Sequence, residues 1–217
     1  MAMNVSNYQR FYKSLLRNNV GIFAIEYKGY GKLSGEQTSE KSINFDIKNA
    51  YEYLANKKNI KPENIIVVGS CVGGFAGVNL AKEKKDIHSL ILIAPTVSMN
   101  YISDKFIMDK NFREGMPKII EKLITKNKFF KWIYGKQMNA IDKVKYIKNT
   151  NIYVIQSRKD NVTRPGGAVK LAKAAKKNGI LKELIMLNHP GHKIDDEKTE
   201  ITSQLVGKIL KEMNTLK

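Results

Sequence analysis

Short apolar runs alternate with amphipathic stretches along most of the chain. The apolar runs have the length and composition of buried strands and lie at residues 21–27, 65–69, 89–95, 151–156 and 183–187. Apolar residues recur at helical spacing in the stretches beside them, at residues 5–19, 43–54, 71–84, 169–177 and 199–213. This alternation predicts an α/β fold, in which a mostly parallel sheet is covered by helices on both faces.

Residues 99–145 interrupt this alternation. They are rich in aromatic side chains and contain no strand pattern. We therefore expect an insertion over 99–145 in a core formed by residues 1–98 and 146–217. In a parallel sheet, chemistry lies at the carboxyl ends of the strands, so the segments that follow the apolar runs are the place to look for functional residues.

The composition is typical of a single folded domain in a reducing compartment. The chain has 217 residues, 42% of them hydrophobic, which is enough for a core and too much for a disordered protein. Its single cysteine excludes a disulfide scaffold. No apolar run approaches the ~18 residues of a membrane span, and the first residues lack the apolar stretch of a signal peptide. We expect a soluble cytoplasmic protein without a transmembrane segment, as a monomer or homo-oligomer.

The chain is strongly basic, with 38 Lys and Arg against 20 Asp and Glu and a formal net charge of +18. Such a charge can bind the protein to a nucleic acid or to an anionic membrane. However, 33 of the basic residues are lysine, and only 5 are arginine, the residue suited to bidentate phosphate and base contacts. We therefore favour a solvated basic surface and expect no specific nucleic-acid partner.

One apolar run leads directly into a glycine-rich turn that holds the only cysteine. Residues 69–74 read Gly-Ser-Cys-Val-Gly-Gly and precede a helical pattern, which is the setting of a nucleophile elbow with Cys71 in the reactive position. A thiol at a helix N-terminus is favoured as the thiolate, and the N–H of Val72 would serve as one oxyanion donor. The alternative is that Cys71 is a small buried residue in a tight turn.

Candidate partners for the thiol follow the last two apolar runs. Asp160 and His192 lie after these runs, so both are expected at the same edge of the sheet as Cys71. The order nucleophile, Asp, His is that of α/β hydrolases. We favour His192 as the base because Gly191 leaves its loop open, whereas His189 precedes a proline and is held extended.

The other histidine and acids are weaker candidates. His88 precedes an apolar run and is expected at the opposite edge of the sheet, in a structural role. Asp195 and Asp196 are rival acids, but they lie too near His192 in the chain to orient it easily. The sequence contains no metal cluster and no P-loop, so we expect no cofactor and no metal.

Taken in order, these motifs resemble the α/β hydrolases of the monoacylglycerol-lipase and bud-emergence-protein type. The similar segments are GIFAIEYKGYGKLSGE, GSCVGG, APTVS, SRKDNVTRP and HPGHK, and the resemblance covers nearly the whole chain. It implies that Cys71, Asp160 and His192 are nucleophile, acid and base, and that Asp46 has a structural role. It also implies that residues 99–145 form a helical cap over an acyl pocket.

The same resemblance suggests which side chains line that pocket. Tyr30, Phe129 and Trp132 are the candidates, and they would give the pocket an apolar acyl- or aryl-binding character. Ordinary packing of a helical insert explains the aromatic residues of 99–145 equally well.

The sequence departs from the family pattern in two ways. Cys71 stands where serine is usual, although dienelactone hydrolases have a similar cysteine elbow. Family members also carry a strand that ends in His-Gly just before the first helix and supplies the other oxyanion N–H. Here the helical pattern at 5–19 begins close to Met1. We expect a truncated hydrolase or a sheet that closes in another way, and a chain that is poorly soluble, oligomeric or of low stability.

These observations lead to two function hypotheses. The first is a hydrolase of carboxylic esters or thioesters, acting on a small-molecule substrate through Cys71, His192 and Asp160. The second is a catalytically impaired hydrolase-fold binding protein or a truncated remnant, because the loss of one oxyanion donor costs about 100- to 1,000-fold in rate.

Overall fold

A computed structural model describes residues 5–33, 39–102, 138–188 and 191–215 of the chain. The strands are β1 (Ile66–Ser70), β2 (Ser89–Ile93), β3 (Asn151–Ser157) and β4 (Leu181–Leu187). The helices are α1 (Gln9–Leu16), α2 (Glu40–Glu52), α3 (Val72–Glu83), α8 (Ala140–Val144), α9 (Pro165–Lys177) and α10 (Asp196–Thr215). Short helical turns cover Val5–Tyr8, Gly31–Leu33, Tyr53–Lys57, Pro62–Asn64 and Met99–Tyr101. These elements confirm the expected alternation of strands and helices, with one exception.

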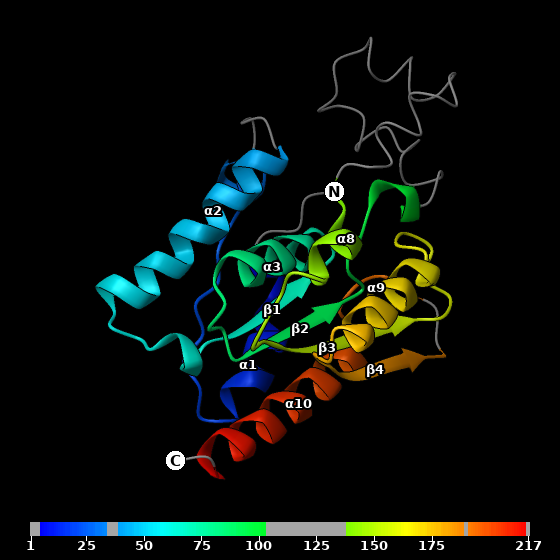
Figure 1. Cartoon of the computed structure of the whole chain (residues 1–217). Helices are drawn as coiled ribbons and strands as arrows, with labels where there is room; N and C mark the ends of the chain where they lie inside the picture. Colours follow the sequence, from blue (N-terminus) through cyan, green and yellow to red (C-terminus); the bar gives the residue numbers. More distant parts are fainter. Residues whose placement is uncertain (1–4, 34–38, 103–137, 189–190, 216–217) are drawn as a thin grey trace.

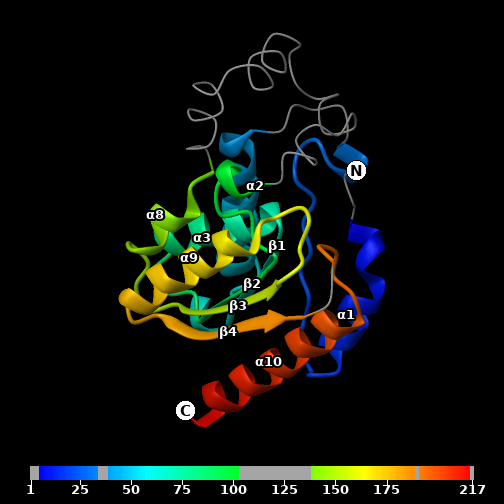
Figure 2. The same cartoon turned by 90° about the vertical axis from the view of Figure 1, so that its right-hand side faces the viewer.

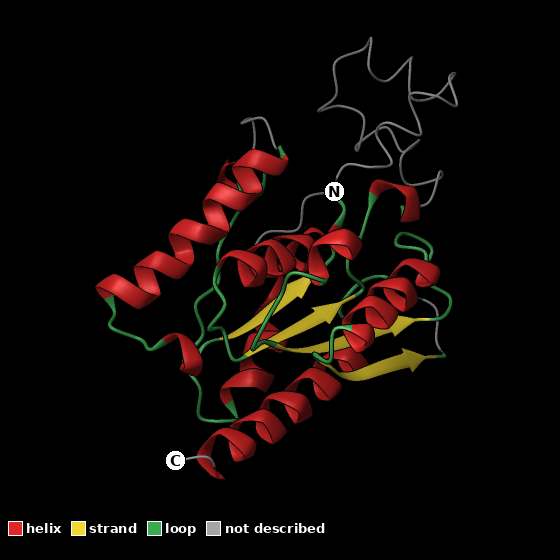
Figure 3. Ribbon diagram, in the orientation of Figure 1, coloured by secondary structure: helices red, strands yellow, loops and turns green. Residues whose placement is uncertain are grey.

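The four strands form one parallel sheet in the order β1-β2-β3-β4 (labelled in Figure 1 and coloured yellow in Figure 3). The strands follow one another in space as they do in sequence, so each connection crosses one face of the sheet and carries a helix. Every residue of β2 is buried, as expected for a strand with neighbours on both sides and helices on both faces. The predicted mostly parallel sheet is therefore confirmed.

Helices cover both faces of this sheet (Figures 1 and 2). On one face α3, α8 and α9 lie over the sheet, and their apolar side chains pack with Leu92 and Val154 in one core cluster. On the other face α1 and α10 pack with Ile93 and Ile155 in a second cluster. Alternate residues of each strand thus enter opposite cores, which is why the strands read as continuous apolar runs.

Local signals in the sequence set the ends of two of these helices. Ser39 accepts a hydrogen bond from the N–H of Ser42 at 3.0 Å, and Ser42 Oγ accepts one from the N–H of Ser39 at 2.9 Å, so a reciprocal capping box starts α2. Gly179, with a φ of 73°, follows the last turn of α9 in the left-handed conformation that suits glycine. Within α2, Asp46 Oδ2 accepts a hydrogen bond from the N–H of Lys28 at 2.9 Å and so ties the preceding loop to this helix.

The prediction of a strand over residues 21–27 is wrong. This segment is neither paired nor buried: Ile22 is 36% exposed, and Phe23 is 49% exposed and stacks on Tyr53. A strand is stable only when its backbone bonds to a neighbour, and in the described part of the chain β1 pairs with β2 alone. Residues 21–27 therefore remain irregular, and β1 is an open edge of the sheet.

Most of the predicted insertion lies outside the described residues. Its described ends are the turn Met99–Tyr101 and the helix α8, and the N–H of Ala140 donates to the carbonyl of Val97 at 2.8 Å. The chain thus returns to the core close to where it leaves. The boundaries of 99–145 and its function as a cap stay predictions.

The open edge of β1 predicts an alternating pattern of amide hydrogen exchange. The N–H of Cys71 donates to the carbonyl of Ile93, the last residue of β2, so the N–H groups of Gly69 and Val67 also point toward β2. Those of Val68 and Ser70 point to the open side. We expect the amides of Val68 and Ser70 to exchange faster than those of Val67 and Gly69.

Exchange measured residue by residue on the monomer tests this expectation. Equal and strong protection along all of β1 would contradict it, because it would require a further backbone segment bonded to this edge.

Candidate active site

The turn after β1 has a strained backbone that places Cys71 at the tip. Cys71 has φ 52° and ψ −117°, a left-handed conformation that is costly for a residue with a side chain. The neighbouring glycines make the turn possible. A Cβ at Gly69 would collide with the carbonyl of Gly73, and one at Gly74 would lie 2.7 Å from Cβ of Pro95. The predicted nucleophile-elbow geometry is thus present.

Hydrogen bonds to the last residue of β2 and to the segment after it hold this elbow in place. The N–H of Cys71 donates to Ile93, and the carbonyl of Cys71 accepts from the N–H of Thr96 at 2.9 Å. The Thr96 hydroxyl lies 3.5 Å from Cys71 Sγ. Cys71 as a whole residue is partly exposed and lies at the start of α3, directly after the carboxyl end of β1.

Asp160 lies in the loop after β3, and its side chain is fully buried. Its Oδ1 accepts hydrogen bonds from the backbone N–H groups of Val162 and Thr163 at 2.8 and 2.9 Å. Its Oδ2 lies 3.1 Å from the side-chain amide of Gln156 and 3.0 Å from the Thr163 hydroxyl. Several donors thus offset the cost of burying this charge and fix the direction of the carboxylate.

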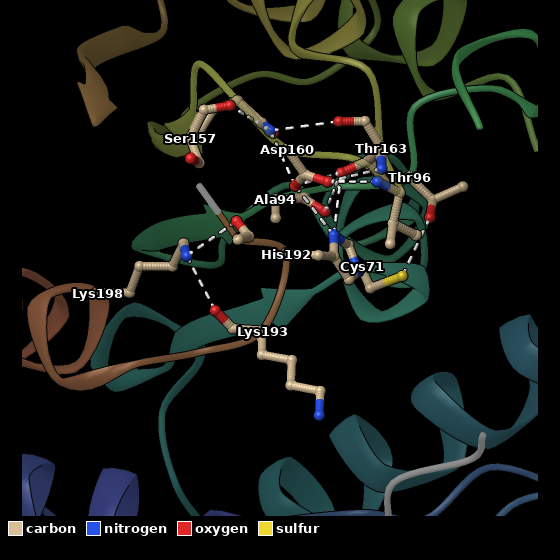
Figure 4. Close-up of polar contacts among 12 residues, drawn as sticks. Cys71, Ala94, Thr96, Ser157, Asp160, Thr163, His192, Lys193 and Lys198 are labelled. Atoms are coloured by element: carbon tan, nitrogen blue, oxygen red, sulfur yellow. Dashed lines mark hydrogen bonds and ion pairs between the residues drawn. The ribbon is translucent and has the colours of Figure 1, made fainter. Parts of the chain in front are cut away.

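His192 reaches the same carboxylate from the loop after β4. Its Nδ1 lies 3.0 Å from Asp160 Oδ2, so a protonated Nδ1 donates to the acid and leaves Nε2 for another partner (Figure 4). The side chain of His192 is 17% exposed. The Thr163 hydroxyl, 3.3 Å from Nδ1, completes the contacts of this nitrogen among the described residues.

The three groups shift one another's proton affinities. Burial alone would raise the pKa of the Cys71 thiol, but the hydrogen bond and positive charge of His192, the Thr96 hydroxyl and the N–H of Val72 lower it below its ordinary value. Burial alone would lower the pKa of His192, but Asp160 and Cys71 raise it to about 9. The pKa of Asp160 is lowered despite its burial, mainly by His192.

These shifts move the pair toward one protonation state. Because the pKa of Cys71 falls and that of His192 rises, both shifts favour a thiolate beside an imidazolium relative to a neutral thiol beside a neutral imidazole. This form is lost as the pH rises through about 9 and the imidazolium deprotonates, and as the pH falls through the lowered pKa of the thiol. A thiolate held next to a proton donor can attack a carbonyl carbon and protonate the group that leaves.

The structure brings together some of the other predicted residues and not all of them. Tyr30 is partly buried, and burial and the charge of Cys71 raise its pKa, so it lies on the side of the nucleophile. The N–H of Val72 faces the thiol and lowers its pKa. Phe129, Trp132 and His189 lie outside the described residues.

The residues judged weaker in the sequence have other partners. Asp195 pairs with Lys198 at 3.0 Å, and Asp196 pairs with Arg10 at 3.5 Å. Nδ1 of His88 lies 2.8 Å from the Ser89 hydroxyl, at the opposite end of β2 from the elbow. None of these contacts involves His192.

Several polar residues of the site were missed from the sequence. Gln156 and Thr163 hold Asp160, Thr96 contacts Cys71, and Tyr8 lies near enough for the charge of Cys71 to raise its pKa after the larger effect of burial. For Gln156, Thr163 and Thr96, the available signal was their place at the ends of β2 and β3, whereas Tyr8 lies in the turn before α1. The residue type was no signal, because Gln, Thr and Tyr are common at such positions without a function.

The described residues contain no cluster of side chains that could hold a metal ion. No helix among them combines the length and apolar character needed to cross a membrane.

Sequence comparisons find relatives of this chain among known proteins. The family model described as "Serine aminopeptidase, S33" (Hydrolase_4) matches residues 1–144. Alpha/beta hydrolase domain-containing protein 17B of Homo sapiens is 36% identical over 98 residues, which are 45% of this chain and 33% of that protein. Protein bem46 of Schizosaccharomyces pombe is 28% identical over 161 residues, 74% of this chain and 48% of the relative. The chain thus spans a third to about a half of the length of these curated relatives.

Solved structures with the same fold include an esterase and a lipase. The esterase Pf2001 of Pyrococcus furiosus matches with a TM-score of 0.72 at 19% identity, over 96% of this chain and 76% of that one. The monoacylglycerol lipase of Paleococcus ferrophilus matches with a TM-score of 0.67 at 14% identity, over 96% and 91% of the two chains. At these identities the likeness shows the α/β-hydrolase fold alone.

The lowered pKa of Cys71 predicts a reactive thiol at neutral pH. We expect Cys71 to react with iodoacetamide at pH 7 faster than glutathione does, because a one-unit fall in pKa raises the thiolate fraction about tenfold. The substitution His192→Gln removes the imidazolium and should move the midpoint of the pH–rate curve upward, to the ordinary value or above it.

The measurement is the alkylation rate between pH 5 and 10, with His88→Gln as the matched control for the loss of a histidine. A wild-type rate no faster than that of glutathione, in a chain shown to be folded, would contradict the lowered pKa. So would a midpoint that His192→Gln leaves unchanged.

Proposed function

Because the chain belongs to the serine aminopeptidase S33 family of α/β hydrolases, we propose that it hydrolyses carboxylic esters or thioesters by acyl transfer through Cys71, His192 and Asp160. The observation that carries the proposal is the meeting of three strand ends. The strained elbow at Cys71 and the 3.0 Å contact between His192 and Asp160 lie at one edge of the sheet.

We also propose a reducing, cytoplasmic compartment for the protein, because the sequence has a single cysteine.

The first half of the reaction forms a thioester with the enzyme. The Cys71 thiolate attacks the substrate carbonyl carbon, the C=O π electrons move onto oxygen, and the N–H of Val72 donates to the resulting oxyanion. The oxyanion then collapses and breaks the bond to the leaving alcohol or thiol. The His192 imidazolium gives its Nε2 proton to that leaving group.

The second half restores the thiolate. His192 takes a proton from water and becomes the imidazolium, the hydroxide equivalent attacks the acyl thioester, and the new oxyanion again faces the N–H of Val72. Collapse of the oxyanion releases the carboxylic acid and the Cys71 thiolate, which again lies beside the imidazolium. Asp160 accepts from Nδ1 throughout, which fixes the tautomer and stabilises the imidazolium.

Activated esters and thioesters suit this nucleophile better than amides do. The weakly basic leaving group of an activated ester, or a leaving thiolate, can depart from the tetrahedral oxyanion with little protonation, whereas an amine must be protonated before it competes with the thiolate of Cys71 as a leaving group. The esterase and the monoacylglycerol lipase among the structural neighbours support a carboxylic-ester substrate. The family description names a serine enzyme, and Cys71 is the residue of this chain at the corresponding elbow.

Turnover of p-nitrophenyl acetate and of a short acyl thioester tests the proposal. We expect Cys71→Ala and His192→Ala each to lower the rate about 1,000-fold or more, to the uncatalysed background, because the groups act as a unit. The controls His88→Ala and His189→Ala should keep most of the activity. Activity that survives Cys71→Ala, or is lost in His189→Ala instead of His192→Ala, would contradict these assignments. A folded chain with a reactive Cys71 and no turnover would favour the hydrolase-fold binding protein.

The basic surface yields a separate prediction about partners. We propose that the chain, despite its net charge of +18, binds no specific nucleic acid. The chain should bind duplex DNA weakly and without sequence preference, and it should release the DNA by about 200 mM salt, because such binding rests on counterion release. Titration of labelled duplexes at increasing salt measures this. Tight binding that persists at that salt would contradict it.

A further inference from the structure

Lys198, in the first turn of α10, has a fully buried ammonium group that the proposed chemistry does not use. Its Nζ lies 2.9 Å from the carbonyl of Lys193, 3.2 Å from the carbonyl of Gly191 and 3.0 Å from Asp195 Oδ2. An ammonium group has three protons and no acceptor, so these three contacts use all of its donors. The charge is therefore paired and fully hydrogen-bonded.

The two carbonyls flank His192 in the chain. Gly191 precedes the histidine and Lys193 follows it, so Lys198 bonds to the backbone on both sides of this residue (Figure 4). These are loop carbonyls after the end of β4, where no strand neighbour satisfies them. Among the described residues, Lys198 is thus the side chain that fixes the backbone from which His192 projects.

Asp195 joins this contact to the start of α10. Its Oδ2 pairs with Lys198 Nζ, while its Oδ1 accepts from the backbone N–H of Lys198 at 2.9 Å and its carbonyl accepts from the N–H of Thr199 at 2.9 Å. One carboxylate thus serves as the counter-charge of the lysine and as the cap of the helix. The loop of His192 and the first turn of α10 therefore form one hydrogen-bonded unit.

Stability alone is a poor explanation for a charge in this place. Burying an ammonium group has a desolvation cost, and apolar side chains of similar volume often stabilise a protein as well or better. What an apolar side chain cannot supply is three donors converging on one point. We infer that Lys198 is a positioning residue for His192, which holds the imidazole in line with both Cys71 and Asp160. This inference rests on the proposed function, because it assigns a role to the residue that positions the base.

The substitution Lys198→Met tests the inference, since it keeps much of the side-chain volume and removes the three donors. The readout is the midpoint of the Cys71 alkylation curve, which depends on where His192 lies and not on stability as such. We expect the midpoint to rise by about one pH unit and the alkylation rate at pH 7 to fall about tenfold. With an ester substrate, kcat should fall about 10- to 100-fold, as for a small misplacement of a catalytic group, while KM changes little.

The matched control is Lys208→Met on the same helix, where an exposed lysine pairs with Glu183 at 3.8 Å. It should leave the midpoint and kcat unchanged. If Lys198→Met does not fold, Asp195→Asn is the second variant: it keeps an oxygen for the helix cap and removes the counter-charge of Lys198. Asp195→Asn should also raise the midpoint of the alkylation curve, by a smaller amount than Lys198→Met.

The outcomes separate this inference from the function on which it rests. A folded Lys198→Met chain with the wild-type midpoint and kcat overturns the inference, and so does an unfolded Lys198→Met together with an Asp195→Asn variant of wild-type midpoint. If the wild-type thiol shows no lowered midpoint, or His192→Gln leaves that midpoint unchanged, the Cys71–His192 pair itself fails and the proposed function fails with it.

Discussion

All four strands of the sheet run in the same direction, and the arrangement of the site depends on this constraint. Parallel strands end at one edge, so the segments after β1, β3 and β4 meet there although they are far apart in sequence. Cys71 follows β1, Asp160 follows β3 and His192 follows β4. The segment after β2 carries none of these three residues, but it anchors the elbow through Thr96. Each strand end therefore contributes to the same group of contacts.

Burial at this edge links the fold to the chemistry. The carboxylate of Asp160 is removed from water, and its hydrogen bonds come from Gln156, Val162, Thr163 and His192. Its charge raises the pKa of His192, and the resulting imidazolium lowers the pKa of Cys71. The lowered pKa of Cys71 is thus the last of a series of effects, and the first of them is the buried, hydrogen-bonded carboxylate of Asp160. The backbone strain at Cys71 is the local cost of presenting the thiol to that imidazolium.

Elements with a local signal could be predicted from the sequence, and those that depend on a distant partner could not. The glycines predicted the elbow at Cys71, and the apolar runs predicted the strands. The order of the motifs predicted Asp160 and His192 as its partners. The segment 21–27 has the same apolar composition as a true strand, but strand formation also needs a hydrogen-bonded neighbour, which composition does not reveal. Lys198 looks like any helical lysine, and its role depends on loop carbonyls that only the folded chain brings to it.

The central claim is that Cys71 carries the acyl group during turnover. The most direct measurement is the intact mass of the protein, followed by peptide mapping, within the first turnovers with p-nitrophenyl acetate or an acyl thioester. The account predicts one acyl group on Cys71 in the wild-type chain, formed and lost in step with product release, and no such adduct in Cys71→Ala. Acylation of another residue during turnover, or turnover that continues in Cys71→Ala, would contradict it.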